Sequence, residues 1–477
     1  MHWTHTASIG ALGAAMRAGR ITSTGLVEAH IDRLRDVEDR LNAIAGGRFE
    51  EARAEAEQAD QRMREGDDAP LLGIPCTIKE FVGVRGMPHT GGLTARAHAI
   101  ADEDATVVAR LRRAGAIVMA VTNVPEGGLW LESYNRIRGR TNNPIDPART
   151  SGGSSGGEAA VIAAGASPFG IGSDMAGSIR IPAMFCGVPG HKPSGRLVPN
   201  TGHYPPPSNE AVSGFMVTGP LARRVDDLYR ILSLIAGPDG RDAAVRPMPL
   251  HDPGRVDLRG VRVMALPRIG RVSIRPSIRG AVHRAMEAAR AAGCPTRTIE
   301  LPALRHAFRI WSDTLSDAAG NGDYAEVLGD GTPIPVGREL VKWTLRRSGH
   351  TAPALALVVL EKLLHRLPAP SRSYTELGVQ LRAEMLEYLG NDGVIVQPTY
   401  SRPAPRHRGP YLTPFDFVCT ALYNLFEFPA TQVPVGVDPR GLPVGVQVVG
   451  APGQDHLTLA VASAIEARSG GWIPPTG

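Results

Sequence analysis

Two polar, glycine-rich stretches carry the residues of this chain that are best suited to chemistry. One covers residues 151–158 (SGGSSGGE) and the other residues 172–180 (GSDMAGSIR). Serine hydroxyls on a backbone with few side chains suit attack on a carbonyl, because bare N–H groups can approach the oxyanion that develops. Upstream, Lys79 follows an apolar run (IPCTI), and burial there would lower its pKa toward that of a base. The combination predicts nucleophilic catalysis by serine with a lysine as the base.

No residue of this combination is decisive by itself. Ser178 follows an expected strand at 169–172, and a serine at such a turn can expose its hydroxyl while N–H groups converge. Ser154 and Ser155 lie between two glycine pairs. Each serine alone is typical of an ordinary turn, and Lys79 alone is typical of a side chain that is ion-paired or reaches solvent. The prediction therefore depends on the serines and the lysine together.

The elements that must position these residues alternate between helix and strand. We expect helices at 23–44, 50–64, 104–114, 276–292 and 455–468, and strands at 74–78, 116–121, 169–172, 262–266, 393–397, 431–435 and 444–449. Strands made of continuous apolar residues are typical of an α/β sheet that helices cover on both faces.

Residues 301–390 differ from the rest of the chain. They have a helical pattern, with Phe308, Trp311 and Trp343 expected at the surface and a leucine-rich run at 355–364. We predict that this region is a helical cap on the substrate side of the enzyme.

Composition narrows the class of protein. The chain has 477 residues, of which 43% are hydrophobic and 21% charged, and its net charge of +5 comes from scattered arginines. This pattern is typical of a globular protein and disfavours a nucleic-acid partner. The four cysteines form no CxxC pair, the N-terminus has no signal-peptide pattern, and the weakly polar run at 159–172 is too short to span a bilayer. We therefore expect a soluble, cytoplasmic protein without an integral membrane segment.

Four segments resemble the amidase signature family: 73–80 (GIPCTIKE), 152–160 (GGSSGGEAA), 172–183 (GSDMAGSIRIPA) and 191–194 (HKPS). Within that family the chain is most similar to the fatty-acid amide hydrolases, since the segments at 422–435 and 454–472 also match. The resemblance runs from about residue 8 to the C-terminus. It implies one large α/β/α catalytic domain over 1–477, built on a central mixed, twisted sheet, with the cap at about 301–390.

The resemblance implies a Ser–Ser–Lys triad. Ser178 would be the nucleophile, Ser154 the bridging serine and Lys79 the base, and the peptide bond between Gly153 and Ser154 would be cis. Neutral Lys79 would accept a proton from Ser154, which would take one from Ser178 as it attacks the amide carbonyl. An acyl-enzyme would remain until water releases the acid.

The resemblance also assigns supporting roles. The N–H groups of four residues would form the oxyanion hole: Met175, Ala176, Gly177 and Ser178. Asp174, Arg180 and Ser155 would support the serine loops, and the acyl side of the substrate would lie against Gly127, Gly128, Leu129 and Trp130. The family usually has glycine where this chain has Ala176, which is compatible with the turn only if that residue does not need a positive φ. The membrane segment that precedes the catalytic region in some animal relatives is missing, which supports the expectation of a soluble enzyme.

We therefore predict an amidase that cleaves a hydrophobic fatty-acyl or aryl carboxamide to an acid and an amine or ammonia. Paired glycines beside Trp130 favour a bulky apolar group. No cofactor and no metal is expected, and the partner is a small-molecule amide. A homodimer and a weak peripheral association with membranes stay open.

Three other interpretations compete with this one. The motif G-x-S-x-G is centred on both Ser154 and Ser155, but a nucleophile elbow needs a strand directly before it, and residues 143–151 predict a loop. Asp455 and His456 are adjacent and cannot easily converge on one serine. A glutamine-amidotransferase A subunit of the same superfamily, working in a multi-subunit complex, is the closer alternative. A non-catalytic binding protein is disfavoured because all three triad positions are filled.

Overall fold

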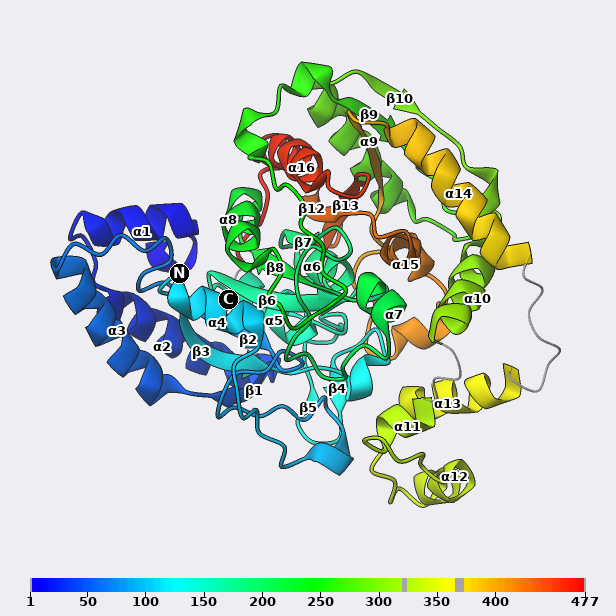
Figure 1. The fold of residues 1–477 in the computed structure, drawn as a ribbon, viewed down its shortest axis with the longest axis horizontal. Coiled ribbons are helices and arrows are strands. Elements are labelled where there is room, and N and C mark those ends of the chain that lie inside the picture. Colours follow the sequence, from blue (N-terminus) through cyan, green and yellow to red (C-terminus); the bar gives the residue numbers. More distant parts are fainter. Residues whose placement is uncertain (1, 320–323, 365–372, 476–477) are drawn as a thin grey trace.

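The computed structural model describes residues 2–319, 324–364 and 373–475 of the chain (Figure 1). In this part of the chain, eleven strands form one mixed sheet. Their order across the sheet is β1 (Ile44–Gly47), β3 (Ile117–Thr122), β2 (Pro75–Lys79), β6 (Phe169–Asp174), β8 (Val217–Ala222), β7 (Gly190–Lys192), β12 (Ala430–Val437), β13 (Pro443–Val449), β11 (Gly393–Pro398), β9 (Arg262–Ala265) and β10 (Thr296–Thr298). The prediction of an α/β fold on a central mixed sheet is confirmed.

Two series of neighbouring helices cover the sheet. One consists of α2 (Ser23–Leu41), α3 (Phe49–Arg64), α5 (Gly156–Ala163) and α6 (Arg180–Cys186), and the other of α4 (Thr106–Arg113), α8 (Val225–Ile235), α16 (Asp455–Ser469) and α9 (Pro276–Ala291). The remaining helices are α1 (Ile9–Arg17), α7 (Glu210–Phe215), α10 (Ala307–Ala319), α11 (Tyr324–Leu328), α12 (Val336–Thr344), α13 (Ala352–Leu364), α14 (Ser373–Leu389) and α15 (Val418–Leu425). The expected helices and strands are all present, within a few residues of their predicted ends.

The helix α2 illustrates how sequence determines one of these elements. Thr22 caps its N-terminus, because the Thr22 side chain accepts a hydrogen bond from the N–H of Gly25. Apolar residues at helical spacing, such as Val27, Ile31 and Leu34, are buried. The helix ends where Asn42 adopts a left-handed conformation.

Strand pairing brings the lysine and one serine stretch to the same edge of the sheet. The strand β2 pairs in parallel with β6, with Thr77 opposite Gly170 and Ile78 opposite Ile171. Both strands therefore end together, β2 at Lys79 and β6 at Asp174. Parallel neighbours place their carboxyl ends at one edge, which is where α/β proteins build their sites.

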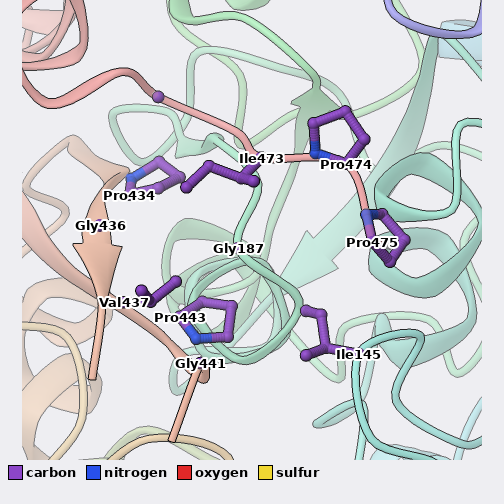
Figure 2. Close-up of a pocket in the computed structure, with 11 residues that line it drawn as sticks. Ile145, Gly187, Pro434, Gly436, Val437, Gly441, Pro443, Ile473, Pro474 and Pro475 are labelled. Atoms are coloured by element: carbon purple, nitrogen blue, oxygen red, sulfur yellow. The ribbon is translucent and has the colours of Figure 1, made fainter. Parts of the chain in front are cut away.

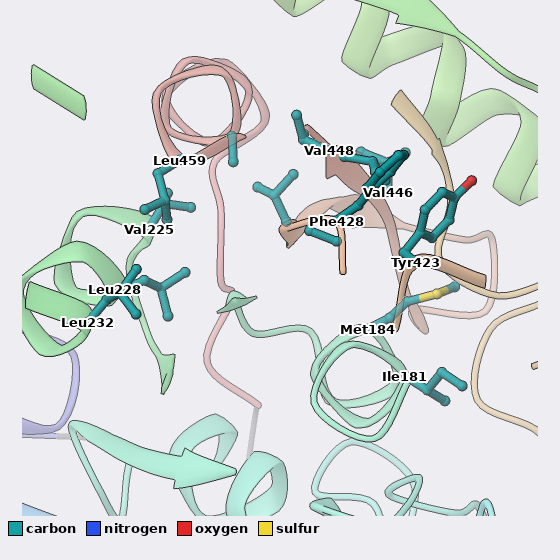
Figure 3. Close-up of a cluster of buried hydrophobic side chains, with 14 of the residues drawn as sticks. Ile181, Met184, Val225, Leu228, Leu232, Tyr423, Phe428, Val446, Val448 and Leu459 are labelled. Atoms are coloured by element: carbon teal, nitrogen blue, oxygen red, sulfur yellow. The ribbon is translucent and has the colours of Figure 1, made fainter. Parts of the chain in front are cut away.

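Buried helices follow both serine stretches and hold them in place. The helix α5 begins at Gly156 and α6 at Arg180, and every residue of both helices is buried. Ile181 and Met184 of α6 belong to one large apolar cluster, and Figure 3 shows Met184 pointing toward Tyr423. Because this packing leaves α6 little freedom, the turn that carries Ser178 is fixed from its C-terminal side.

The helical region at 301–390 is not one unit, which corrects the boundaries that were predicted for it. The helices α10 and α14 pack on the main core through Ile310, Leu381 and Met385, and only α11 to α13 stand away from the sheet (Figure 1). Phe308 and Trp311, expected at the surface, are partly buried against that core, because they contact Phe415 and Phe417. Trp343 is exposed, as predicted. The parts of this region at 320–323 and 365–372 lie outside the described residues, as does the side chain of Leu364 in the leucine-rich run.

No helix among the described residues is both long enough and apolar enough to cross a membrane.

Candidate active site

The lysine predicted as the base lies completely buried at the end of β2. Its Nζ atom is 2.7 Å from the Oγ atom of Ser154, 3.0 Å from Ser173 Oγ and 3.1 Å from the carbonyl oxygen of Ser173. The ring of Phe81 lies 4.8 Å from the same nitrogen. Lys79 is therefore hydrogen-bonded only to serine groups in the described chain, and forms no ion pair there.

Burial lowers the pKa of Lys79 from 10.5 to about 7, although the charge of Asp174, and that of Glu158 when it is ionised, act in the opposite direction. Burial also raises the pKa of Glu158 to about 8, so this nearby carboxyl is largely protonated at neutral pH. A large fraction of Lys79 is consequently the neutral amine near pH 7, which is the form that can accept a proton.

The first serine stretch is held tightly against its surroundings. The peptide bond between Gly153 and Ser154 is cis, as the resemblance implied. Ser133 Oγ donates to the carbonyl of Gly152 at 3.1 Å and accepts from the N–H of Gly156 at 3.0 Å. A Cβ atom on Gly153 would lie 2.6 Å from the carbonyl oxygen of Trp130, so glycine is required at that position.

The two serine stretches are joined through Ser155. Its N–H donates to the carbonyl of Ser178 at 3.1 Å, and its Oγ donates to the carbonyl of Ser173 at 3.3 Å. Ser155 itself is completely buried. Through these two contacts Ser155 links the backbones of the two stretches.

The hydroxyl of Ser178 is the accessible one. Ser178 is half-buried, whereas Ser154 and Ser155 are buried. In the described chain the Ser178 hydroxyl makes no hydrogen bond, so the contact from Lys79 to Ser154 is formed and the contact from Ser154 to Ser178 is not. A rotation of one or both serine hydroxyls has to close the second contact before a proton can pass.

An ion pair holds the turn that carries Ser178. Asp174 accepts hydrogen bonds from the N–H groups of Gly177 at 2.6 Å and Ile179 at 3.0 Å, and the Arg180 guanidinium contacts the same carboxylate at 3.0 Å through two nitrogens. Arg180 also donates to Gln447, and both charged groups are completely buried. Burial alone would raise the pKa of Asp174, but Arg180 holds that pKa well below its ordinary value. Asp174 therefore remains a carboxylate at neutral pH.

The predicted oxyanion hole needs one correction. The N–H of Gly177 already donates to Asp174, so it is not a free donor. The N–H groups of Met175, Ala176 and Ser178 have no acceptor among the described residues. These three N–H groups remain available to an oxyanion beside Ser178.

The segment predicted for the acyl side lies close to the lysine. It includes the short helix η3 (Glu126–Gly128), and a Cβ atom on Gly128 would lie 3.0 Å from the Phe81 ring that covers Lys79. Leu129 and Trp130 are partly exposed. The rings of Trp130 and Tyr411 are 4.9 Å apart, which brings the loop after β11 to the same place.

Sequence reasoning missed two residues of this cluster. Ser173 contacts Lys79 through both its hydroxyl and its carbonyl, and His203 contacts the Ser173 hydroxyl at 2.9 Å. Ser173 belongs to the quoted motif at 172–180, so its place in the motif could have identified it. His203 lies in a loop 30 residues after Ser173 in the sequence. No local sequence pattern identifies it.

The structure does not support the nucleophile-elbow alternative. Residues 143–151 form a loop before the first serine stretch, as predicted. Asp455 contacts His191 at 3.0 Å and accepts a hydrogen bond from the N–H of Ser194, and the ring of His456 packs on His251. Neither Asp455 nor His456 forms a hydrogen bond to a serine of the two stretches in the described chain.

The described residues contain no group of three or more His, Cys, Asp or Glu side chains placed to hold a metal ion. A pocket of about 190 Å³ lies elsewhere in the molecule. Figure 2 shows its apolar and glycine lining, which includes Ile145, Pro434, Pro443 and Ile473. None of its lining residues belongs to the serine–lysine cluster.

Comparison with known proteins gives consistent results. Residues 25–459 match the family model described as Amidase. Fatty-acid amide hydrolase 2-A of Danio rerio is 38% identical over 482 residues, which cover 97% of this chain and 89% of the relative. The A subunit of glutamyl-tRNA(Gln) amidotransferase from Roseiflexus sp. (strain RS-1) is 31% identical over 95% of this chain and 94% of its own length. A solved structure of fatty acid amide hydrolase superposes with a TM-score of 0.80 at 25% identity, covering 98% of this chain and 86% of that one.

Proposed function

The chain belongs to the amidase family and is an amide hydrolase, and from that premise we propose that it cleaves a hydrophobic carboxamide through an acyl-enzyme on Ser178. The observation that carries this proposal is the buried Lys79, whose Nζ lies 2.7 Å from Ser154 Oγ. A lysine whose pKa is lowered to about 7 and that is bonded to a serine is suited to be a general base.

In the proposed reaction, neutral Lys79 accepts the proton of Ser154 while Ser154 accepts the proton of Ser178. The Ser178 oxygen forms a bond to the amide carbonyl carbon, and the carbonyl oxygen becomes an oxyanion that the N–H groups of Met175, Ala176 and Ser178 stabilise. The proton returns to the nitrogen as the carbon–nitrogen bond breaks, and the amine leaves. Water then attacks the ester to Ser178, is deprotonated by the same route, and releases the acid.

We propose that the acyl group of the substrate lies against the segment from Gly127 to Trp130. Two arguments support a bulky apolar group, either fatty acyl or aryl. Gly128 carries no side chain into the space beside Phe81. The partly exposed Trp130 ring and the exposed Tyr411 ring lie together and form an aromatic wall. An aromatic wall of this kind favours an apolar ligand.

Labelling with a fluorophosphonate probe tests the role of Ser178. The probe phosphonylates an activated serine, and peptide mass spectrometry then identifies the modified residue. We expect the adduct on Ser178 and complete loss of labelling in Ser178→Ala. An adduct on Ser154 or Ser155, or labelling that survives Ser178→Ala, would contradict the assignment.

The alternative function is that of a glutamine-amidotransferase A subunit. The 31% identity to an A subunit of glutamyl-tRNA(Gln) amidotransferase supports this alternative. The higher identity to a fatty-acid amide hydrolase, 38%, favours the hydrolase. Comparing hydrolysis of glutamine with that of aryl and long-chain amides by the isolated protein separates the two. Turnover of glutamine alone would favour the amidotransferase.

Two finer proposals concern the location and partners of the enzyme. Its four cysteines are free thiols, which supports the expected cytoplasmic location. Val341, Trp343 and Leu345, on α12 and just after it, are exposed, which supports a weak peripheral association with membranes. Sedimentation with phosphatidylcholine vesicles tests the association, and analytical ultracentrifugation tests whether the protein is a homodimer.

A further inference from the structure

A chain of hydrogen bonds continues beyond Lys79 to a histidine that the proposed reaction does not use. Lys79 Nζ lies 3.0 Å from Ser173 Oγ, Ser173 Oγ lies 2.9 Å from His203 Nε2, and His203 Nδ1 lies 2.9 Å from the carbonyl oxygen of Pro205. Lys79, Ser173 and His203 are all buried. The Phe81 ring packs edge-on against the imidazole, with ring centroids 5.8 Å apart.

The direction of each hydrogen bond in this chain follows from its last member. The carbonyl of Pro205 can only accept, so the proton of neutral His203 lies on Nδ1. His203 Nε2 is then an acceptor and takes the single proton of the Ser173 hydroxyl. Because the single hydroxyl hydrogen of Ser173 is used in the hydrogen bond to His203, Ser173 Oγ can only accept a hydrogen bond from Lys79.

A count of protons then fixes the orientation of the amine. Neutral Lys79 has two N–H bonds and one lone pair. One N–H is taken by the carbonyl of Ser173 and the other by Ser173 Oγ, so the lone pair faces the third neighbour, Ser154 Oγ. That is the arrangement in which Ser154 donates its proton to the lysine.

We propose that His203 is a positioning residue that orients the Ser173 hydroxyl so that the lone pair of Lys79 faces Ser154. Without an acceptor at His203 Nε2, the Ser173 hydroxyl could donate to Lys79 instead. An N–H bond of the amine would then face Ser154, and the proton transfer would be blocked. The inference rests on the proposed function, since it assumes that Lys79 is the base.

The charges around the chain agree with a neutral histidine. The groups that face Lys79 are Asp174 from β6 and Glu158 from α5, and those that face His203 are Lys79 and His89. The pKa of His203 is lowered to about 3, mainly by burial, and the charges of Lys79 and His89 act in the same direction. The imidazole therefore does not titrate in the range in which Lys79 does.

Two substitutions of His203 separate its two contacts. In His203→Asn the side-chain amide can still donate to Pro205, but no group reaches Ser173. In His203→Gln the amide oxygen can take the place of Nε2 and accept from Ser173. Both variants are compared with the parent by thermal unfolding, and by kcat, KM and the pH profile of kcat/KM on a long-chain or aryl amide. His203→Asn is also made in a Ser173→Ala background, where the hydroxyl to be oriented is absent.

We expect His203→Asn to lower kcat about 10- to 100-fold with little change in KM, as part of the 10²–10⁴ that a positioned base contributes. His203→Gln should recover most of that loss, and in the Ser173→Ala background the Asn substitution should have little further effect. The acid limb of the pH profile should not move to higher pH, because Lys79 stays buried. The inference is overturned if His203→Asn keeps the parental kcat, if both variants lose activity equally, or if the limb moves toward alkaline pH. If Lys79→Met also keeps full activity, the proposed function fails instead.

Discussion

Replacing Lys79 with methionine tests whether the buried lysine serves catalysis at the expense of stability. Methionine has a similar length, no titratable group and enough flexibility to fill the same space. The variant cannot accept a proton from Ser154, so amide hydrolysis should fall about 10²- to 10⁴-fold, the range that a positioned general base contributes. KM should change little, because Lys79 acts on Ser154 and not on the substrate.

The gain in stability can be worked out from the environment of Lys79. Burial lowers its pKa from 10.5 to about 7, and at 1.36 kcal/mol per pKa unit this difference corresponds to about 5 kcal/mol at acidic pH. Methionine removes that cost. It also leaves Ser154 Oγ without its partner, whereas Ser173 Oγ keeps His203 and the Ser173 carbonyl keeps Ser155. One unsatisfied hydroxyl costs about 1–3 kcal/mol. Subtracting this cost from the roughly 5 kcal/mol that methionine recovers leaves a net gain in stability of about 2–4 kcal/mol near pH 6.

The gain has a definite dependence on pH. The pKa of Lys79 is lower in the folded state than in the unfolded state, so between about 7 and 10.5 the unfolded chain binds more protons. The free energy of unfolding of the parent protein therefore rises with pH between about 7 and 10.5. The free energy of unfolding of Lys79→Met does not show this rise, because methionine does not titrate. Between pH 6 and pH 9 the advantage of the variant should shrink by about 2.6 kcal/mol.

Urea unfolding at pH 6 and pH 9, with amide turnover measured on the same preparations, provides the assay. Lys192→Met is a matched control, because burial also lowers the pKa of Lys192 to about 7 and its only hydrogen-bond partner in the described chain is the Pro193 carbonyl. The control should show a similar gain in stability and retain activity. Lys79→Met that is inactive and strongly destabilised at pH 6 would refute the stability argument, and full activity would refute the role of Lys79 as base.

Three further predictions concern the same site. The kcat/KM of the parent should rise with pH through about 7 as Lys79 loses its proton, and a profile that is flat from pH 5 to 9 would contradict this. Gly177→Ala should abolish turnover, because Gly177 has a φ of +123° and an added Cβ would collide with Thr420 Oγ1; Ala176→Gly is its control and should stay active. Trp130→Ala should raise KM about 10-fold for long-chain or aryl amides, from lost apolar contact, and leave the KM of acetamide unchanged, as substrate kinetics will show.

The parts of the fold that local patterns determine could be predicted from the sequence. The apolar run before Lys79 predicts a buried strand, and β2 does end at that residue. The glycines around Ser154 predict a turn, and the loop at 143–151 distinguishes that turn from a nucleophile elbow. In these cases the neighbours in sequence are also the neighbours that decide the conformation.

The remaining features depend on residues that are distant in sequence. The helices α10 and α14 look like the rest of the 301–390 region in composition, but Ile310 and Leu381 find partners in the main core. The N–H of Gly177 donates to Asp174, whose carboxylate is held in place by a buried ion pair with Arg180. His203 reaches Ser173 only because the fold returns its loop to the end of β6. No periodicity or motif in the sequence records such contacts.

Ala176 stands at a position where the resemblance to the amidase signature family implies glycine, and the geometry explains why alanine is tolerated there. Ala176 is not among the residues with a positive φ, whereas its neighbour Gly177 has a φ of +123°. The Thr420 hydroxyl donates to the carbonyl of Ala176 at 2.7 Å and occupies the space that a side chain at Gly177 would need. The turn therefore requires glycine at one position of the pair and not at both. Because the methyl group of Ala176 leaves its own N–H free, the substitution is compatible with the proposed oxyanion hole.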